Sequence, residues 1–357
     1  MTHVGHGERG QAAAESLRAS LLRIDKSILS LIAARMNIAD VLGEVKKESG
    51  MSVYDPSREI TVANLLAEEA VKLGIPPNLA KEIYFMVARE TRCRQLYCPE
   101  TVRIAVYGYG GMGRMLASML SRAGCWVAVT GRSPEKAREA AKAVGAKYME
   151  QEYAIDWADM VIYTVPTPAL GELLPRHWSL YRESMLIADI ASVKTPVVKL
   201  VERLYREHGT GPEYASLHPL FGPLSCPAGE NVAVVPVRLE RWRERLDALL
   251  QGLGLVPVYI DASQHDKAMA VNQVLHHLVY ELYGRASAML ARELGVEPAA
   301  LKQLVTWSLR QTLSTLARLE SLKPVIEEIR AENPYTRQAL EALREALEEL
   351  ERETARS

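Results

Sequence analysis

Apolar residues recur at helical spacing through the first part of the chain. In the stretch "SLRASLLRIDKSILSLIAARMNIADVLGEVKKE" they share one face: Leu17, Leu21, Ile24, Ile28, Leu31 and Ile32. Neither glycine nor proline interrupts this pattern before Gly43. The pattern therefore predicts one helix of roughly 45 Å, at 1.5 Å per residue, after a flexible tail over residues 1–14.

Two shorter helices are predicted to follow. Asp55 can cap the second, with Pro56 in the first helical position, and "LGIPPN" ends it. The third runs from about Asn78 to Gln95, which completes an all-α module over residues 15–97. Because the first helix is longer than the other two, much of its apolar face would stay exposed to solvent in a single copy, and a second copy of the chain would cover it. We therefore expect an intertwined homodimer.

From Thr101 the pattern changes to apolar strands that alternate with helices. The predicted strands are "VRIAVYG", "WVAVTG", "MVIYTVP", "MLIADIA", "EYASLHP", "NVAVVP" and "VPVYID". This alternation predicts an α/β doubly wound domain over residues 101–260. Residues 261–357 are helical again, which predicts an all-α substrate and dimerisation domain and makes the fold class multidomain.

Charge and composition favour a small-molecule ligand. The 43 basic and 44 acidic residues give a net charge of -1, without a polybasic block for nucleic acid or an anionic membrane. No apolar run is long enough to span a membrane, and the first residues lack a signal-peptide core, so we expect a cytoplasmic protein. The four cysteines show neither a CxxC pair nor zinc spacing, so we expect them to be reduced and structural, and expect no metal site.

A glycine motif lies between a predicted strand and a predicted helix. In "VYGYGGMGR", Gly108 permits the turn, Gly110 admits a pyrophosphate, and Gly113 lets helix and strand pack closely. Gly111 and Met112 complete this dinucleotide-binding turn. The next strand ends in "VTGRSPEKA" without the acid that accepts from an NAD ribose. Arg132 and Ser133 instead suit a 2'-phosphate, which favours NADP over NAD, unless Arg132 is merely a solvated surface residue.

Polar residues interrupt the inward faces of the leading helices. Arg35 and Lys46 are eleven residues apart, close to three turns, so they share a face. Thr91 and Gln95 continue the inward stripe of Val87. Ordinary intrahelical ion pairs are the alternative explanation for any one of them, but buried polar groups need partners.

Eight polar positions in this module resemble the active-site set of the all-helical chorismate mutases over about residues 16–96. They are Arg18, Arg35, Lys46, Asp55, Arg58, Glu59, Thr91 and Gln95. The resemblance implies that Arg18 from the other protomer, Arg35 and Arg58 hold carboxylates. It also implies that Lys46 and Gln95 donate to the breaking ether bond while Glu59 takes the ring hydroxyl.

Residues 101–325 resemble the prephenate dehydrogenases through "SLHPLFGP", "ADIASVKT", and the pair Arg310 and Arg318. The resemblance implies that His218 is the catalytic histidine and that Arg318 binds a substrate carboxylate. Ser192 and Lys194 would orient substrate and cofactor, and His277 matches a substrate-site histidine unless it is a core residue. His265 and His276 are predicted to be structural.

The two resemblances together imply a fused enzyme of tyrosine biosynthesis. It would convert chorismate to prephenate, and prephenate to 4-hydroxyphenylpyruvate with NADP or NAD. Two alternatives are an arogenate dehydrogenase with the same domains, and an NADP-sensing regulator whose helical segment only dimerises. The regulator predicts neither the eight polar positions nor His218, so their joint presence argues against it.

Overall fold

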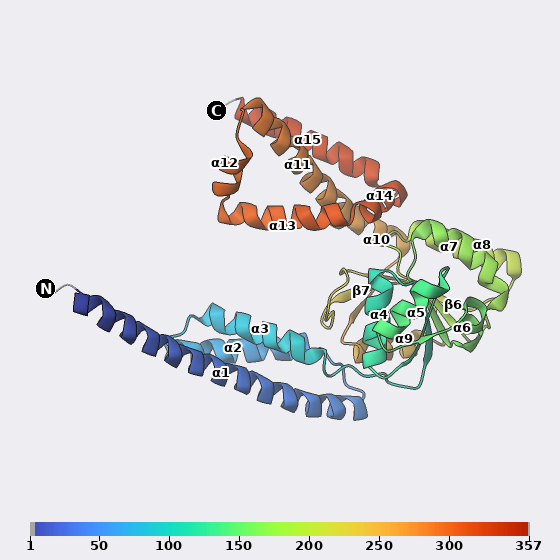
Figure 1. Ribbon diagram of the computed structural model, residues 1–357. Helices are drawn as coiled ribbons and strands as arrows, with labels where there is room; N and C mark the ends of the chain where they lie inside the picture. The colour runs from blue at the N-terminus through green and yellow to red at the C-terminus, as the bar shows by residue number, and fades with distance from the viewer. Residues whose placement is uncertain (1–3, 356–357) are drawn as a thin grey trace.

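The chain folds into three parts in the predicted order (Figure 1). The computed structural model describes residues 4–355. Three leading helices and a final group of helices project as separate arms from a central domain built on an eight-stranded sheet. Over the described residues, none of the helices is both long and apolar enough to cross a membrane.

The first arm consists of α1 (Val4–Glu48), α2 (Pro56–Lys72) and α3 (Pro77–Arg92). Asp55 caps α2 as predicted, since its side chain accepts from the backbone N–H of Arg58 at 2.9 Å. The helix α1 begins at Val4, so most of the stretch predicted as a flexible tail is helical, and its residues 1–3 lie outside the described part. The predicted end of α3 was wrong, because after Arg92 the backbone turns and Gln95 N–H donates to Arg92 O.

The apolar face of α1 is largely uncovered. Leu17, Ile24 and Leu31 are 67%, 56% and 72% exposed, because α2 and α3 are much shorter than α1. Burying such side chains is worth about 1.5 to 3 kcal/mol each.

The central sheet has the strand order β3-β2-β1-β4-β5-β6-β7-β8. Its strands are β1 (Arg103–Tyr107), β2 (Trp126–Thr130), β3 (Lys147–Tyr148), β4 (Met160–Tyr163), β5 (Leu186–Asp189), β6 (Glu213–Pro219), β7 (Asn231–Arg238) and β8 (Val256–Tyr259). The pairs from β1 to β6 are parallel, whereas β7 runs antiparallel to β6. All strands except the two-residue β3 were predicted. The order reverses between β1 and β4, which is where doubly wound sheets bind ligands.

Helices cover both faces of the sheet. One face packs against α4 (Gly111–Arg122), α5 (Pro134–Ala143) and α9 (Arg243–Gly252), and the other against α6 (Gln151–Trp157), α7 (Thr167–His177), the 3-10 turn Trp178–Leu180 and α8 (Thr195–His208). In β1, Ile104 and Val106 join the first core whereas Ala105 and Tyr107 join the second. This alternation explains why the strand is apolar throughout.

The final arm contains α10 (Ala262–Met269), a π-helical turn (Ala270–Leu275), α11 (His276–Glu293), α12 (Pro298–Gln303), α13 (Trp307–Ser321), α14 (Lys323–Glu332) and α15 (Thr336–Thr354). Thr306 caps α13 by accepting from Leu309 N–H, which breaks one predicted helix into α12 and α13.

The expectation of reduced cysteines was wrong. Cys93 is bonded to Cys226, and Cys98 to Cys125, over sequence separations of 133 and 27 residues. Neither pair has a local spacing that marks it in the sequence, because folding brings the partners together. The first bond joins the end of α3 to the loop that follows β6.

Candidate active sites

The glycine motif forms the turn between β1 and α4 as predicted. Gly108 has a φ of 133°, and a Cβ on it would lie 2.3 Å from Thr164 Oγ1. A Cβ on Gly113 would lie 2.5 Å from Gly108 O, so both positions require glycine. At Gly110 a Cβ would meet nothing within 4 Å, and α4 begins at Gly111 with its first backbone N–H groups free of helical partners. These residues fit a dinucleotide pyrophosphate.

Arg132 and Ser133, which were predicted to lie on the ribose side of this site, follow the end of β2. Arg132 is exposed, and the preceding Gly131 packs against Tyr109, since a Cβ there would lie 2.9 Å from its ring. Ser133 Oγ accepts from Lys136 N–H at 3.4 Å and so caps α5. Because the hydroxyl only accepts in this cap, its own proton remains available to an anion.

A cavity of about 510 Å³ lies at the carboxyl edge of the sheet. It brings together four residues of the predicted set, which come from different elements: Met112, Ser192, His218 and Arg318. The π-helical turn adds Asn272 and Gln273, which the sequence prediction missed. Turns of this type are frequent at functional sites. The Oε1 atom of Gln273 is buried without a hydrogen-bond partner among the described residues.

His218 is the second-to-last residue of β6 and is 5% exposed. Burial holds the pKa of His218 well below its ordinary value of 6.5, and Lys194 and His265 lower it further. The imidazole is therefore neutral at pH 7, as a proton acceptor must be.

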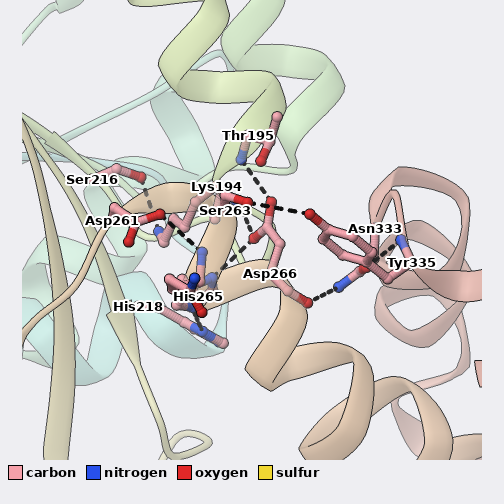
Figure 2. Close-up of polar contacts among 12 residues, drawn as sticks. Lys194, Thr195, Ser216, His218, Asp261, Ser263, His265, Asp266, Asn333 and Tyr335 are labelled. Atoms are coloured by element: carbon pink, nitrogen blue, oxygen red, sulfur yellow. Dashed lines mark hydrogen bonds and ion pairs between the residues drawn. The ribbon is translucent and has the colours of Figure 1, made fainter.

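His265, predicted to be structural, contacts His218. The two rings are joined through His218 Nδ1 and His265 Nε2 at 3.0 Å, and His265 Nδ1 lies 2.9 Å from Asp266 Oδ1 (Figure 2). In the sequence, the adjacent His265 and Asp266 in "QHDK" were the one sign of a polar site here. That α10 lies beside β6, and so brings His265 to His218, is seen only in the fold.

Asp266 is held by several donors. The backbone N–H groups of Lys194 and Thr195 each donate to its carboxylate at 2.8 Å, and Asn333 Nδ2 donates to its main-chain oxygen at 3.0 Å (Figure 2). Burial alone would raise the pKa of Asp266, but the hydrogen bonds from His265, Thr195 and Lys194 outweigh it and lower the pKa. The carboxylate is thus ionised and fixed.

Lys194, predicted to orient substrate and cofactor, does not line this cavity. Its side chain is fully buried behind the cavity, where Nζ donates to Ser216 Oγ at 2.9 Å and to Leu217 O at 2.6 Å. Asp189 lies 3.6 Å away, yet burial still lowers the pKa of Lys194. Lys194 therefore supports the strand that carries His218.

Two other predicted residues lie apart from His218. Arg310 is exposed near the start of α13 and does not line the cavity. His277 lines a different cavity of about 470 Å³ with Glu281 and Arg330. Burial, followed by the charges of nearby groups, lowers the pKa of His277 to about 4.

In the first arm, the predicted polar residues of α1, α2 and α3 cluster. Arg35 Nη1 donates to Thr91 Oγ1 at 3.1 Å, and Lys46 Nζ donates to Val53 O at 2.7 Å. Burial lowers the pKa of Lys46 although Glu59 opposes this, and burial raises the pKa of Glu59 although Arg92 opposes it. Arg92, which the sequence prediction missed, pairs with Glu59 at 3.4 Å.

The remaining predicted residues of this arm divide into two groups. Gln95 is 7% exposed, and its Oε1 lacks a hydrogen-bond partner among the described residues. Asp55 caps α2, whereas Arg58 and Arg18 are exposed. Arg18 lies 17 residues before Arg35 on one helix, about 25 Å away at 1.5 Å per residue, and so cannot reach this cluster.

Known proteins share the fold and part of the sequence. The crystal structure of prephenate dehydrogenase from A. aeolicus with hydroxyphenyl propionate and NAD+ aligns with a TM-score of 0.57 at 19% identity, over 72% of this chain and 92% of that chain. At this identity the likeness shows the fold alone. The T-protein of Enterobacter agglomerans is 28% identical over 281 residues, which cover 75% of this chain and 69% of that protein. A 4-amino-4-deoxyprephenate dehydrogenase from Streptomyces pristinaespiralis is 30% identical over 67% of this chain and 80% of its own length.

A glycine turn at the switch point of a doubly wound sheet, beside a cavity with a buried neutral histidine, defines a dehydrogenase that uses a nicotinamide dinucleotide. Residues 116–233 match the family described as prephenate dehydrogenase, nucleotide-binding domain, and residues 17–96 match chorismate mutase type II. The chain belongs to the prephenate dehydrogenase family and carries a chorismate mutase type II domain in front of it.

Proposed function

We propose that the chain converts chorismate to prephenate in its first arm and oxidatively decarboxylates prephenate to 4-hydroxyphenylpyruvate at the sheet domain. The observation that carries the second activity is the cavity shared by His218, Ser192, Arg318 and Met112. It combines a proton acceptor, a hydroxyl, a cation and a residue of the glycine turn.

In the mutase reaction, catalysis consists of holding a flexible dianion in a compact conformation. Arg35 supplies a cation for a carboxylate, and Lys46 with Gln95 donates to the ether oxygen, where charge builds as the bond breaks. Arg58 and Arg18 complete the set, with Arg18 supplied by a second protomer. That arrangement requires the homodimer, which would also cover the exposed apolar face of α1.

In the dehydrogenase reaction, a bound nicotinamide dinucleotide supplies the hydride acceptor. His218 accepts the proton of the substrate's C4 hydroxyl, and Ser192 supports this contact with its own hydroxyl. Arg318, from α13, holds a substrate carboxylate. Loss of carbon dioxide then restores the aromatic ring.

We propose NADP as the preferred cofactor. Arg132 would pair with the 2'-phosphate, and the hydroxyl proton left over from the Ser133 cap would donate to it. The cytoplasmic location is likewise a proposal, and in that compartment the two disulfides would have to resist reducing thiols.

The test is turnover by the purified chain. Chorismate alone should be converted to prephenate. When prephenate and arogenate are each offered with NAD and with NADP, NADPH should be produced from prephenate. A chain that oxidises only arogenate would disprove the substrate assignment. A chain that binds NADP without any turnover would instead be a sensor.

A further inference from the structure

The hydrogen bonds among His218, His265 and Asp266 fix where the protons lie. The three residues are 5%, 1% and 0% exposed, so water does not exchange for these partners. An ionised carboxylate only accepts, so Asp266 Oδ1 must receive its bond from the Nδ1–H of His265. A neutral His265 then has a lone pair at Nε2, which accepts from the Nδ1–H of His218.

We propose that His265 and Asp266 are positioning residues for the dehydrogenase, which hold His218 as the Nδ1–H tautomer with Nε2 as the acceptor toward the cavity. This inference rests on the proposed function of His218 as base. A doubly protonated His265 would donate to His218 instead, which would place the proton of His218 on Nε2 and abolish the acceptor. The direction of the two hydrogen bonds that link His218, His265 and Asp266 thus determines whether His218 Nε2 can accept a proton.

The surroundings support a base that becomes charged only transiently. Lys194 lies behind β6 with Asp189, Arg318 faces the cavity from α13, and Asp266 lies beyond His265 on α10. When His218 takes the substrate proton, its Nδ1–H bond to His265 strengthens and Asp266 stabilises the pair from behind. The same geometry therefore opposes a resting cation and favours one in the transition state.

Two substitutions of His265 separate positioning from packing. His265→Leu removes the acceptor for His218 Nδ1–H, whereas the amide oxygen of His265→Gln can restore it. We expect His265→Leu to lower kcat for prephenate by about 10²-fold or more, and His265→Gln to recover part of that loss. Dinucleotide Kd and mutase turnover should match those of His208→Gln, a control at an exposed histidine.

The tautomer itself can be measured. In protein labelled with 15N at the histidine rings, NMR should show His218 protonated at Nδ1. Asp266→Ala removes the oxygen that accepts the Nδ1–H of His265, so the proton of His218 should no longer be held at Nδ1 and kcat should fall.

Equal kcat for the Leu and Gln variants of His265, or a wild-type His218 protonated at Nε2, would overturn the proposal. If wild-type protein does not oxidise prephenate, the proposed function fails, while the tautomer measurement still tests the positioning pair.

Discussion

Replacing His218 by Asn removes the proton acceptor while keeping its anchor. The Asn side-chain amide can occupy the place of the imidazole Nδ1–H and donate to His265 Nε2, which now lies 3.0 Å from Nδ1. The ring atom Nε2, which we propose as the proton acceptor, is lost. A positioned general base contributes about 10²- to 10⁴-fold, so kcat for prephenate should fall by that factor, or about 3 to 5 kcal/mol of barrier.

The pH profile sharpens this prediction. Because burial and Lys194 depress the pKa of His218, the base stays neutral at pH 7, and wild-type activity should be lost only as the pH falls well below 6.5. This acid limb should be absent from the His218→Asn variant. Stopped assays of prephenate oxidation between pH 4.5 and 9 would show both, with mutase turnover of the same sample as the folding control. A folded variant with near-normal kcat would refute the role of His218.

Three further predictions concern other parts of the molecule. Arg132→Ala should lower kcat/KM for NADP but not for NAD, by roughly 10- to 100-fold, since a charge-assisted contact is worth about 1.5 to 3 kcal/mol; a wild type that prefers NAD would contradict this. Lys46→Ala should abolish chorismate turnover and spare prephenate oxidation, and loss of both activities in this variant would mean that they share one site. In the wild type, mutase activity should decline as the pH rises through the lowered pKa of Lys46, because the ammonium is lost there. Cys93→Ser opens a 133-residue loop and should lower the free energy of unfolding by up to about 5 kcal/mol. Thiol titration of the denatured variant should detect the free thiol of Cys226, and an unchanged Tm would show that the bond does not stabilise the fold.

Local patterns were sufficient for most of the helices and strands. The apolar run of β1, the cap at Asp55 and the glycine turn depend on neighbours in sequence, so they could be predicted. His218 and Arg318 were found through resemblance, and the fold brings them to one cavity.

The missed features depend on contacts between distant segments. His265 meets His218 across 47 residues, and Cys93 meets Cys226 across 133. Lys194 follows β5 among the predicted site residues, but its side chain turns into the core toward Ser216 and does not line the cavity. The spacing of apolar residues indicates which face of a helix or strand is buried. It does not indicate which residues of distant segments pack against that face.

The bond between Cys93 and Cys226 spans the boundary between the first arm and the sheet domain. Any backbone cut after Cys93 and before Cys226, including one in the connecting segment at Pro99–Thr101, leaves the two pieces covalently attached. A protease should therefore convert the chain to two bands on a reducing gel and one on a non-reducing gel. Each molecule would therefore keep one copy of the first arm and one copy of the sheet domain, even after the backbone that connects them is cut.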